Sequence, residues 1–184
     1  MGDETAEVES DGEAVARLRA TAHPVRLRIL SLLTAEAMSA ADVARALDLT
    51  HANASYHLRV LHDAGELLVE SEEKIRGGMA KRYRYRVGGD PDRPHSPGSS
   101  VEDRIAWQSA THSEIVRRLA SATSGPGTSS DIETWVDAET WREAMDAIVG
   151  AMNLLHDNAR PPRTEGTIHV SASSQGFVME DDAR

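Results

Sequence analysis

The stretch THANASYHLRVLHDAG, residues 50–65, decides the fold that this sequence predicts. Apolar side chains recur in it at spacings of four and three residues, which places three of them on one face of a helix: Ala54, Leu58 and Leu61. Thr50 is suited to begin this helix because its hydroxyl can accept a hydrogen bond from a backbone N–H of the first turn. Gly65 stands where such a helix ends. The sequence therefore predicts a helix over residues 50–64.

The remaining surface of this helix carries polar side chains of the kinds that contact DNA. They are short donors and acceptors and one forked cation, which suit base edges and phosphates in a major groove: His51, Asn53, Ser55, His57 and Arg59. A solvated surface is the alternative for an isolated amphipathic helix. His57 is equally suited to packing between helices.

A shorter helical pattern, SAADVARALDL at residues 39–49, comes before this helix and favours the DNA interpretation. Ser39 is placed to cap it, with Asp42 three residues later, although a full capping box would have Glu or Gln there. Asp48 and Leu49 leave only a short turn before the next helix begins. Two short helices joined by such a turn are the helix-turn-helix arrangement, whose second helix is the recognition helix.

A basic arm, KIRGGMAKRYRYR at residues 74–86, follows the two helices. Tyrosine and arginine alternate in it, which is strand periodicity, and residues 67–70 supply a first strand. A glycine pair at residues 77–78 supplies the tip between the strands. Four cations are candidates for contacts with the DNA backbone or the minor groove: Lys74, Arg76, Lys81 and Arg82. The alternative is an edge strand that its charges protect from aggregation.

These motifs together resemble the ArsR-like winged helix-turn-helix transcriptional regulators. The resemblance rests on HPVRLRILSLL at residues 23–33, AADVARALDL, ASYHLRVLHDAG and KRYRYR, in this order. It covers about residues 14–87 and continues more weakly to the C-terminus. It implies a mainly α fold with a small wing, a homodimer to which the first helix contributes, and repression as the default activity. Relatives that sense metals through cysteines offer no guide here, because this chain has no cysteine.

Composition limits the other functions. The net charge is −10, yet residues 14–86 hold twelve basic and eight acidic side chains, so positive charge gathers in the part proposed to bind DNA. The absence of cysteine excludes disulfides and thiolate metal sites. We see no signal peptide, membrane span or catalytic motif, so we expect a cytoplasmic protein that is not an enzyme and needs no cofactor.

The pattern divides the chain into an acidic disordered tail (1–12), a winged helix-turn-helix domain (13–88), a linker (89–100) and a helical dimerisation or effector region (101–184). In the last region we expect helices at residues 101–121 and 138–158 and a short strand at 167–172. The helices carry apolar seams, one with Val101, Ile105, Gln108, His112, Ile115 and Leu119, the other with Trp141, Met145, Ile148, Met152 and Leu155. We favour an antiparallel helix pair completed by a second subunit over a bundle formed with the winged domain of the same chain.

The C-terminal region contains candidate residues for two kinds of ligand site. His112, His156 and His169 lack the close pairing typical of zinc-sensing helices, so we predict no metal site. An apolar effector pocket is an alternative to plain core for Trp107, Trp135, Trp141, Met145 and Met152. The sequence thus predicts a dimeric repressor that binds double-stranded DNA, with a possible small-molecule effector; the alternative is a winged-helix protein-interaction module without a specific DNA target.

Overall fold

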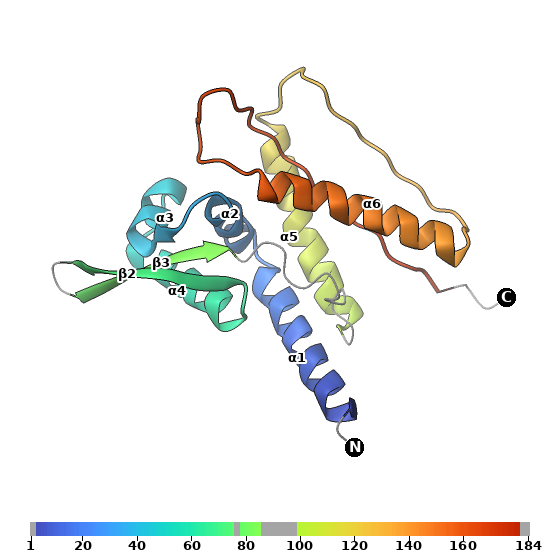
Figure 1. Ribbon diagram of the computed structural model, residues 1–184, viewed down its shortest axis with the longest axis horizontal. Helices are drawn as coiled ribbons and strands as arrows, with labels where there is room; N and C mark the ends of the chain where they lie inside the picture. Colours follow the sequence, from blue (N-terminus) through green and yellow to red (C-terminus); the bar gives the residue numbers. More distant parts are fainter. Residues whose placement is uncertain (1–2, 76–77, 86–98, 181–184) are drawn as a thin grey trace.

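The computed structural model describes residues 3–75, 78–85 and 99–180, and within them the chain forms six α-helices and three strands. In chain order these are α1 (Asp3–Thr21), α2 (Pro24–Leu33), β1 (Met38–Ser39), α3 (Ala40–Leu47), α4 (His51–Asp63), β2 (Leu67–Ile75), β3 (Gly78–Tyr85), α5 (Val101–Leu119) and α6 (Ala138–Asp157). The β2–β3 hairpin projects from one end of the molecule and α6 from the other (Figure 1). This is the mainly α, winged helix-turn-helix fold that the sequence predicted.

The winged part has one continuous apolar core. Eight buried side chains from α2, α3, α4 and the start of β2 form it: Ile29, Leu30, Leu33, Val43, Ala54, Leu58, Leu61 and Leu67. The predicted stripe of α4 supplies three of them, which confirms the period of that helix. The sheet has the order β1-β3-β2 with antiparallel pairing throughout, and a register shift between Val69 and Ser71 accommodates Glu70. The strand that was expected at residues 67–70 is therefore longer than predicted.

Side-chain caps fix where the helices of this part begin and end. Thr50 accepts a hydrogen bond from Asn53 N at 3.2 Å, as predicted for the start of α4. Ser39 caps α3, and Asp42 returns a bond to Ser39 N at 3.0 Å, so aspartate completes a capping box for which glutamate or glutamine was expected. Gly65 follows α4 with φ +76°, which an L side chain rarely adopts. The ends of the two central helices thus follow from local chemistry.

The N-terminus differs from the prediction. Disorder was expected over residues 1–12, but α1 begins at Asp3. Glutamate and alanine are good helix formers, and acidic residues near a helix N-terminus interact favourably with its dipole. Lack of large apolar residues therefore did not prevent a helix in this segment.

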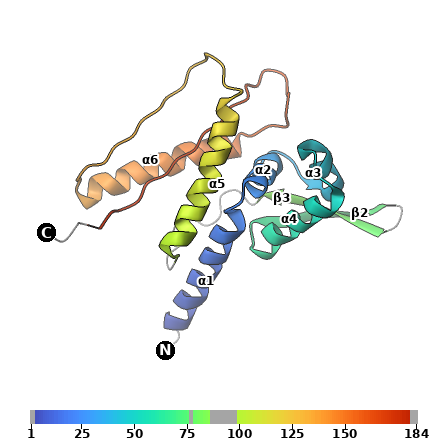
Figure 2. The ribbon, with the colours of Figure 1, turned by 180° about the vertical axis from the view of Figure 1, so that it is seen from behind.

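Helix α5 packs against α1 and α2 rather than pairing with α6, which corrects the expected antiparallel pair. Figure 2 shows α5 alongside α1, and Arg19 of α1 joins Asp103 of α5 through bonds of 2.8 and 2.9 Å. The physical reason is that the face of α5 that meets the chain is not its predicted seam. It carries Ala110 and Glu114, which are buried, whereas Val101, Ile105 and Leu119 of the seam are exposed. Within one chain, α5 thus extends the winged part.

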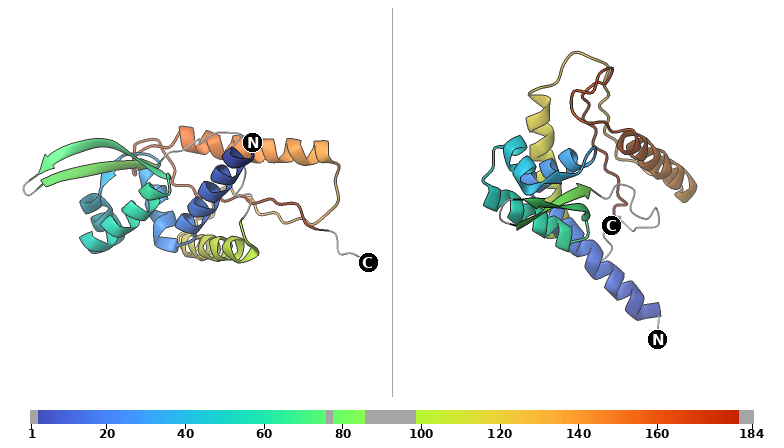
Figure 3. Two further views of the ribbon diagram at one scale, coloured as in Figure 1. Left: turned by 90° about the horizontal axis from the view of Figure 1, so that it is seen from below. Right: turned by 60° about the vertical axis from the view of Figure 1, so that its left-hand side comes forward.

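Helix α6 lies apart from the core of the winged part (Figure 3). Four of its five predicted seam residues are half-buried, and His156 takes the place of Leu155, which is exposed. The strand expected at residues 167–172 does not form among the described residues; Ile168 is 83% exposed there. A strand needs a neighbouring edge, and this segment instead continues along α6, where Gly176 meets the side chains of Trp141 and Met145. Residues 86–98, which include most of the linker predicted at residues 89–100, lie outside the described residues.

Candidate nucleic-acid interface

The outward face of α4 lies opposite the buried stripe and is open to solvent. Its amphipathic geometry exposes Asn53, Arg59 and Tyr56, the last with 57% of its surface accessible. The helix is held from beneath by Ala54, Leu58 and Leu61, each at most 1% exposed. A rigid helix that presents an amide, a phenol hydroxyl and a guanidinium on one face has the donors and acceptors that base edges and phosphates require.

The N-terminal turn of α4 holds three more residues that the sequence singled out. The Thr50 hydroxyl caps the helix, so the prediction of a cap is confirmed, and the residue itself is exposed. His51 is exposed in the first turn, and Ser55 is half-buried on the flank of the helix. The helix N-terminus also carries partial positive charge from its unpaired N–H groups. This end of α4 is therefore suited to approach a phosphate.

His57 lies at the contact between α4 and α2 rather than on the outward face. Its ring is 5.0 Å from the ring of His23, the residue that caps α2 by accepting from Val25 N at 3.1 Å. Burial lowers the pKa of His57, and the neighbouring His23 and Arg26 lower it further. The ring is thus held neutral between two helices. Of the two roles weighed for His57, the geometry favours packing.

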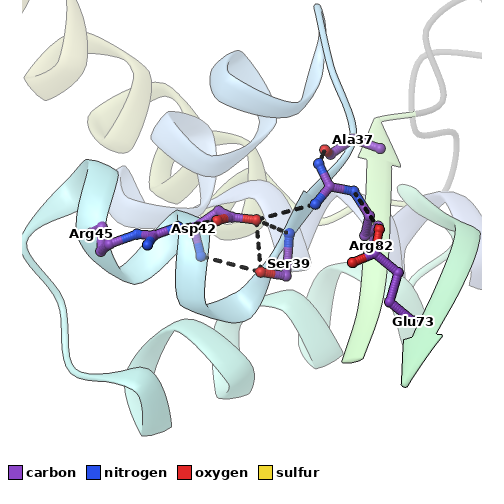
Figure 4. A network of polar contacts seen from close by, with 6 residues as sticks. All are labelled: Ala37, Ser39, Asp42, Arg45, Glu73 and Arg82. Atoms are coloured by element: carbon purple, nitrogen blue, oxygen red, sulfur yellow. Dashed lines mark hydrogen bonds and ion pairs between the residues drawn. The ribbon is translucent and has the colours of Figure 1, made fainter. Parts of the chain in front are cut away.

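The wing carries the predicted cations, but the structure gives several of them acidic partners. Lys74 is exposed, Arg76 lies outside the described residues, and Lys81 pairs across the strands with Glu72 at 3.9 Å. Arg82 forms the centre of a network (Figure 4). It donates to Ala37 O at 2.5 Å and lies 3.4 Å from Asp42.

The Arg82 network joins the wing to the helix-turn-helix. Asp42, besides capping α3, accepts from Arg45, so one carboxylate links two helix positions to β3. The hydrogen bond from the Ser39 hydroxyl lowers the pKa of Asp42, and bonds from Ser39 N and Arg45 lower it further against the opposing effect of burial. Arg82 also lies 4.0 Å from Glu73 of β2. Arg82 thus positions the wing, and its guanidinium is partly engaged before any DNA arrives.

Sequence reasoning missed two features of this surface. The first is Tyr56, which was not predicted as a contact residue. It follows Ala54 by two residues, so a helical projection of the sequence places it away from the buried stripe. The acidic residues of β2 were also left out, because only antiparallel register brings Glu70 and Glu72 opposite the arginines and lysine of β3. Arg84, for example, donates to Glu70 at 2.5 Å.

The described residues contain no group of three or more histidine, cysteine, aspartate or glutamate side chains close enough to hold a metal ion. None of the described helices is long and apolar enough to cross a membrane.

Comparison with known proteins supports the coarse assignment of the fold. Residues 21–70 match a protein family described as a helix-turn-helix domain, the segment that contains α2, α3, α4 and the start of β2. No curated protein is significantly similar to the chain. Helix-turn-helix domains are typical of DNA-binding regulators and are typically not enzymes. The matched segment and the observed wing agree in placing a winged helix-turn-helix domain in the first half of this chain.

Proposed function

We propose that the protein is a sequence-specific, DNA-binding transcriptional regulator whose helix α4 enters the major groove. The observation that carries this proposal is the outward face of α4, where Asn53, Tyr56 and Arg59 are exposed on a helix anchored by buried leucines. Asn and Arg are the side chains that recognise adenine and guanine edges through paired hydrogen bonds. His51 and Ser55 flank this face and contact backbone or base, while Thr50 presents the helix N-terminus to a phosphate.

In this proposal the wing supplies affinity more than sequence choice. Lys74 is next to Ile75, the last residue of β2. We assign Lys74, and Arg76 from its position in the sequence, to contacts with the sugar-phosphate backbone. Lys81 and Arg82 exchange part of their pairing with Glu72, Glu73 and Asp42 for phosphates when DNA binds. Because each cation gives up an acidic partner when it binds a phosphate, its net contribution to DNA affinity is limited. We therefore expect α4 to determine sequence specificity.

We further propose a homodimer formed through the exposed apolar stripe of α5. Four side chains that are each more than half exposed recur along one side of this helix: Val101 (56%), Ile105 (60%), Val116 (53%) and Leu119 (64%). The stripe lies opposite the face that packs on α1 and α2, so a second subunit has access to it. Exposed apolar stripes of this kind mark interaction surfaces. A two-fold axis there predicts a near-palindromic site with half-sites about one DNA turn apart.

Ile105→Lys tests the dimer, with Arg104→Lys as the neighbouring control that retains its charge. Sedimentation of the purified protein should show a dimer that Ile105→Lys converts to a monomer and that Arg104→Lys leaves intact. A monomeric wild-type protein would refute this part of the proposal. We also propose repression as the sign of regulation, on the resemblance to ArsR-like regulators, and a location in the cytoplasm.

A protein-interaction module is the second candidate, and the wing is the observation in its favour. The three positive charges of β3 each have an acidic partner on β2, namely Glu70, Glu72 or Glu73, so the hairpin is less basic than its second strand alone. A module of this kind would bind DNA only weakly and with steep salt dependence. The exposed polar face of α4 is what favours the regulator over this alternative.

Binding to fragmented genomic DNA from the source organism distinguishes the two functions. The purified protein is incubated with the fragments at physiological salt, and the retained DNA is sequenced. The regulator predicts a few sharp sites that share an inverted repeat. Diffuse or absent enrichment refutes the proposal and favours the protein-interaction module.

A further inference from the structure

A cavity of about 240 Å³ lies at the junction of the winged part and the C-terminal part. Residues of α2, α5 and α6 line it, together with Tyr85 at the end of β3 and residues 172–174 of the C-terminal segment. A cavity of about 150 Å³ holds a benzene ring, so this one has room for a single ring with a small substituent. The helix α2 that forms one wall also packs on α4. The cavity therefore adjoins α2, and α2 packs on α4, the candidate DNA-binding helix.

The walls of the cavity are apolar around most of its surface. Leu27 and Leu30 of α2 face it, and Trp107 of α5 and Met152 of α6 complete this lining. A flat aromatic body suits such walls because an indole ring and a thioether both make favourable contacts with aromatic rings. Two of the residues weighed from sequence as a possible effector pocket, Trp107 and Met152, are thus at one cavity. Trp135, by contrast, is 83% exposed.

Glu114 and Arg118 line the cavity, and together with Arg117 they form an ion-paired group whose net charge is positive. Glu114 is only 3% exposed, and its Oε2 is shared by two guanidinium groups, at 2.7 Å from Arg117 and 3.9 Å from Arg118. One carboxylate therefore meets two cations, and Arg118 is the more distant partner. Arg118 lines the cavity and is otherwise 3.5 Å from the Ser171 hydroxyl. An anion beside Arg118 would balance the remaining charge.

An unsatisfied hydroxyl lies on the same wall. Thr111 Oγ1 is buried, and among the described residues it has no hydrogen-bond partner. A buried polar atom without a partner costs free energy, and a ligand that supplies one recovers it. Thr111 is on α5, two turns before Arg118, and lines the cavity. His156, held neutral because burial lowers its pKa, adds a hydrogen-bonding group without adding charge.

We propose that this cavity binds a single-ring aromatic carboxylic acid, with its carboxylate at Arg118 and the Thr111 hydroxyl and its ring between Trp107, Leu30 and Met152. Binding couples to DNA affinity because the ligand fixes α2, and so α4, against α5 and α6. A ligand changes that affinity only by its differential binding to the two arrangements. The coupling rests on the proposed DNA-binding function, whereas the binding of the acid does not.

Calorimetric titration of the full chain tests the site with benzoate, its neutral amide benzamide and the cation benzylamine. Benzoate should bind at least tenfold more tightly than either of the others. Arg118→Met should weaken benzoate binding at least tenfold, while Arg104→Met, an exposed position on the same helix, should leave it unchanged. Equal binding of benzoate and benzamide, tighter binding of benzylamine, or an unchanged affinity in Arg118→Met overturns the proposal.

Thr111→Val gives a second readout that keeps the test independent of folding. This nearly isosteric change removes the unsatisfied hydroxyl, so it should raise the thermal midpoint of the free protein and weaken benzoate binding together. A lower midpoint with unchanged benzoate binding contradicts the assigned role. Titration of retained genomic DNA, with and without benzoate, then separates the two proposals. Benzoate binding without DNA binding refutes the regulator alone, and DNA binding without benzoate binding refutes the cavity alone.

Discussion

The two halves of this chain use their apolar side chains in different ways. In the winged part, Ile29, Leu33 and Leu61 are fully buried against partners from other helices of the same chain. In the C-terminal part, α6 has no buried residue, and Trp135 and Val178 are 83% and 79% exposed. The first part therefore holds its own hydrophobic core, whereas the second presents apolar surface that other molecules can cover.

The difference implies that the stability of the protein resides mainly in the winged part, whereas the C-terminal part is the one that responds to a ligand. A helix gains most of its stability from the packing of its apolar face, so α4 is fixed and α6 is the more readily displaced. Rigid placement suits a helix that must match the spacing of base edges. A loosely packed helix such as α6 suits the wall of a ligand site, because it can move to enclose the ligand.

Core truncation should have the largest effect. Leu58→Ala removes a side chain that is 1% exposed at the centre of the winged core, and we expect the free energy of unfolding to fall by about 3 kcal/mol. Leu154→Ala is the matched control on α6, where the side chain is 65% exposed, and its effect should stay within about 0.5 kcal/mol. Chemical denaturation followed by circular dichroism measures both. Similar losses in the two variants would abolish the distinction between the regions.

Removal of helix caps should have an intermediate effect. Ser39 and Ser100 each accept a bond from the backbone N–H three residues later, at 3.3 and 3.1 Å. Ser39→Ala also disturbs the Asp42 network of the wing, so it should cost about 1 kcal/mol. Ser100→Ala should cost less, because the exposed first turn of α5 can fray without unfolding the core. A larger loss for Ser100→Ala in the same denaturation experiment would show that α5, not α3, limits stability.

Acid should destabilise the winged part through its neutral histidines, and this effect should be the smallest. Burial lowers the pKa of His23 and of His57, whereas an unfolded histidine titrates near about 6.5. Between that value and the lower folded pKa, the unfolded chain binds more protons, so stability falls as pH falls. His57→Gln should flatten the dependence of the thermal midpoint on pH between 7 and 5. An unchanged slope in His57→Gln would refute the assignment.

The sequence was sufficient for elements whose apolar period matches partners in the same chain. The stripe of α4, the cap at Thr50 and the turn at Gly65 are local signals, and each predicted what the structure contains. The fold class followed from their order. Local chemistry predicted these features because the contacts that stabilise them span only a few residues.

Features that depend on long-range contacts could not be predicted in this way. The seam of α5 was recognised, but only the tertiary structure shows that Ile105 faces solvent while Glu114 faces the core. The strand predicted at residues 167–172 does not form, because an alternating pattern of side chains does not provide a neighbouring strand with which to pair. The pairing of Arg82 with Asp42, forty residues away, depends on how β3 meets α3. Of the candidate site, the helix face was foreseen, whereas the partial neutralisation of the wing was not.

The affinity of Arg59→Ala for a retained genomic fragment tests the central claim most directly. Fluorescence anisotropy at physiological salt compares it with the wild-type protein and with Arg142→Ala, an exposed arginine of α6. A contact of Arg59 with a base or phosphate predicts a loss of at least about tenfold with an unchanged thermal midpoint, and no loss for Arg142→Ala. Equal affinity of Arg59→Ala and the wild-type protein would contradict the claim that α4 contacts DNA through its outward face.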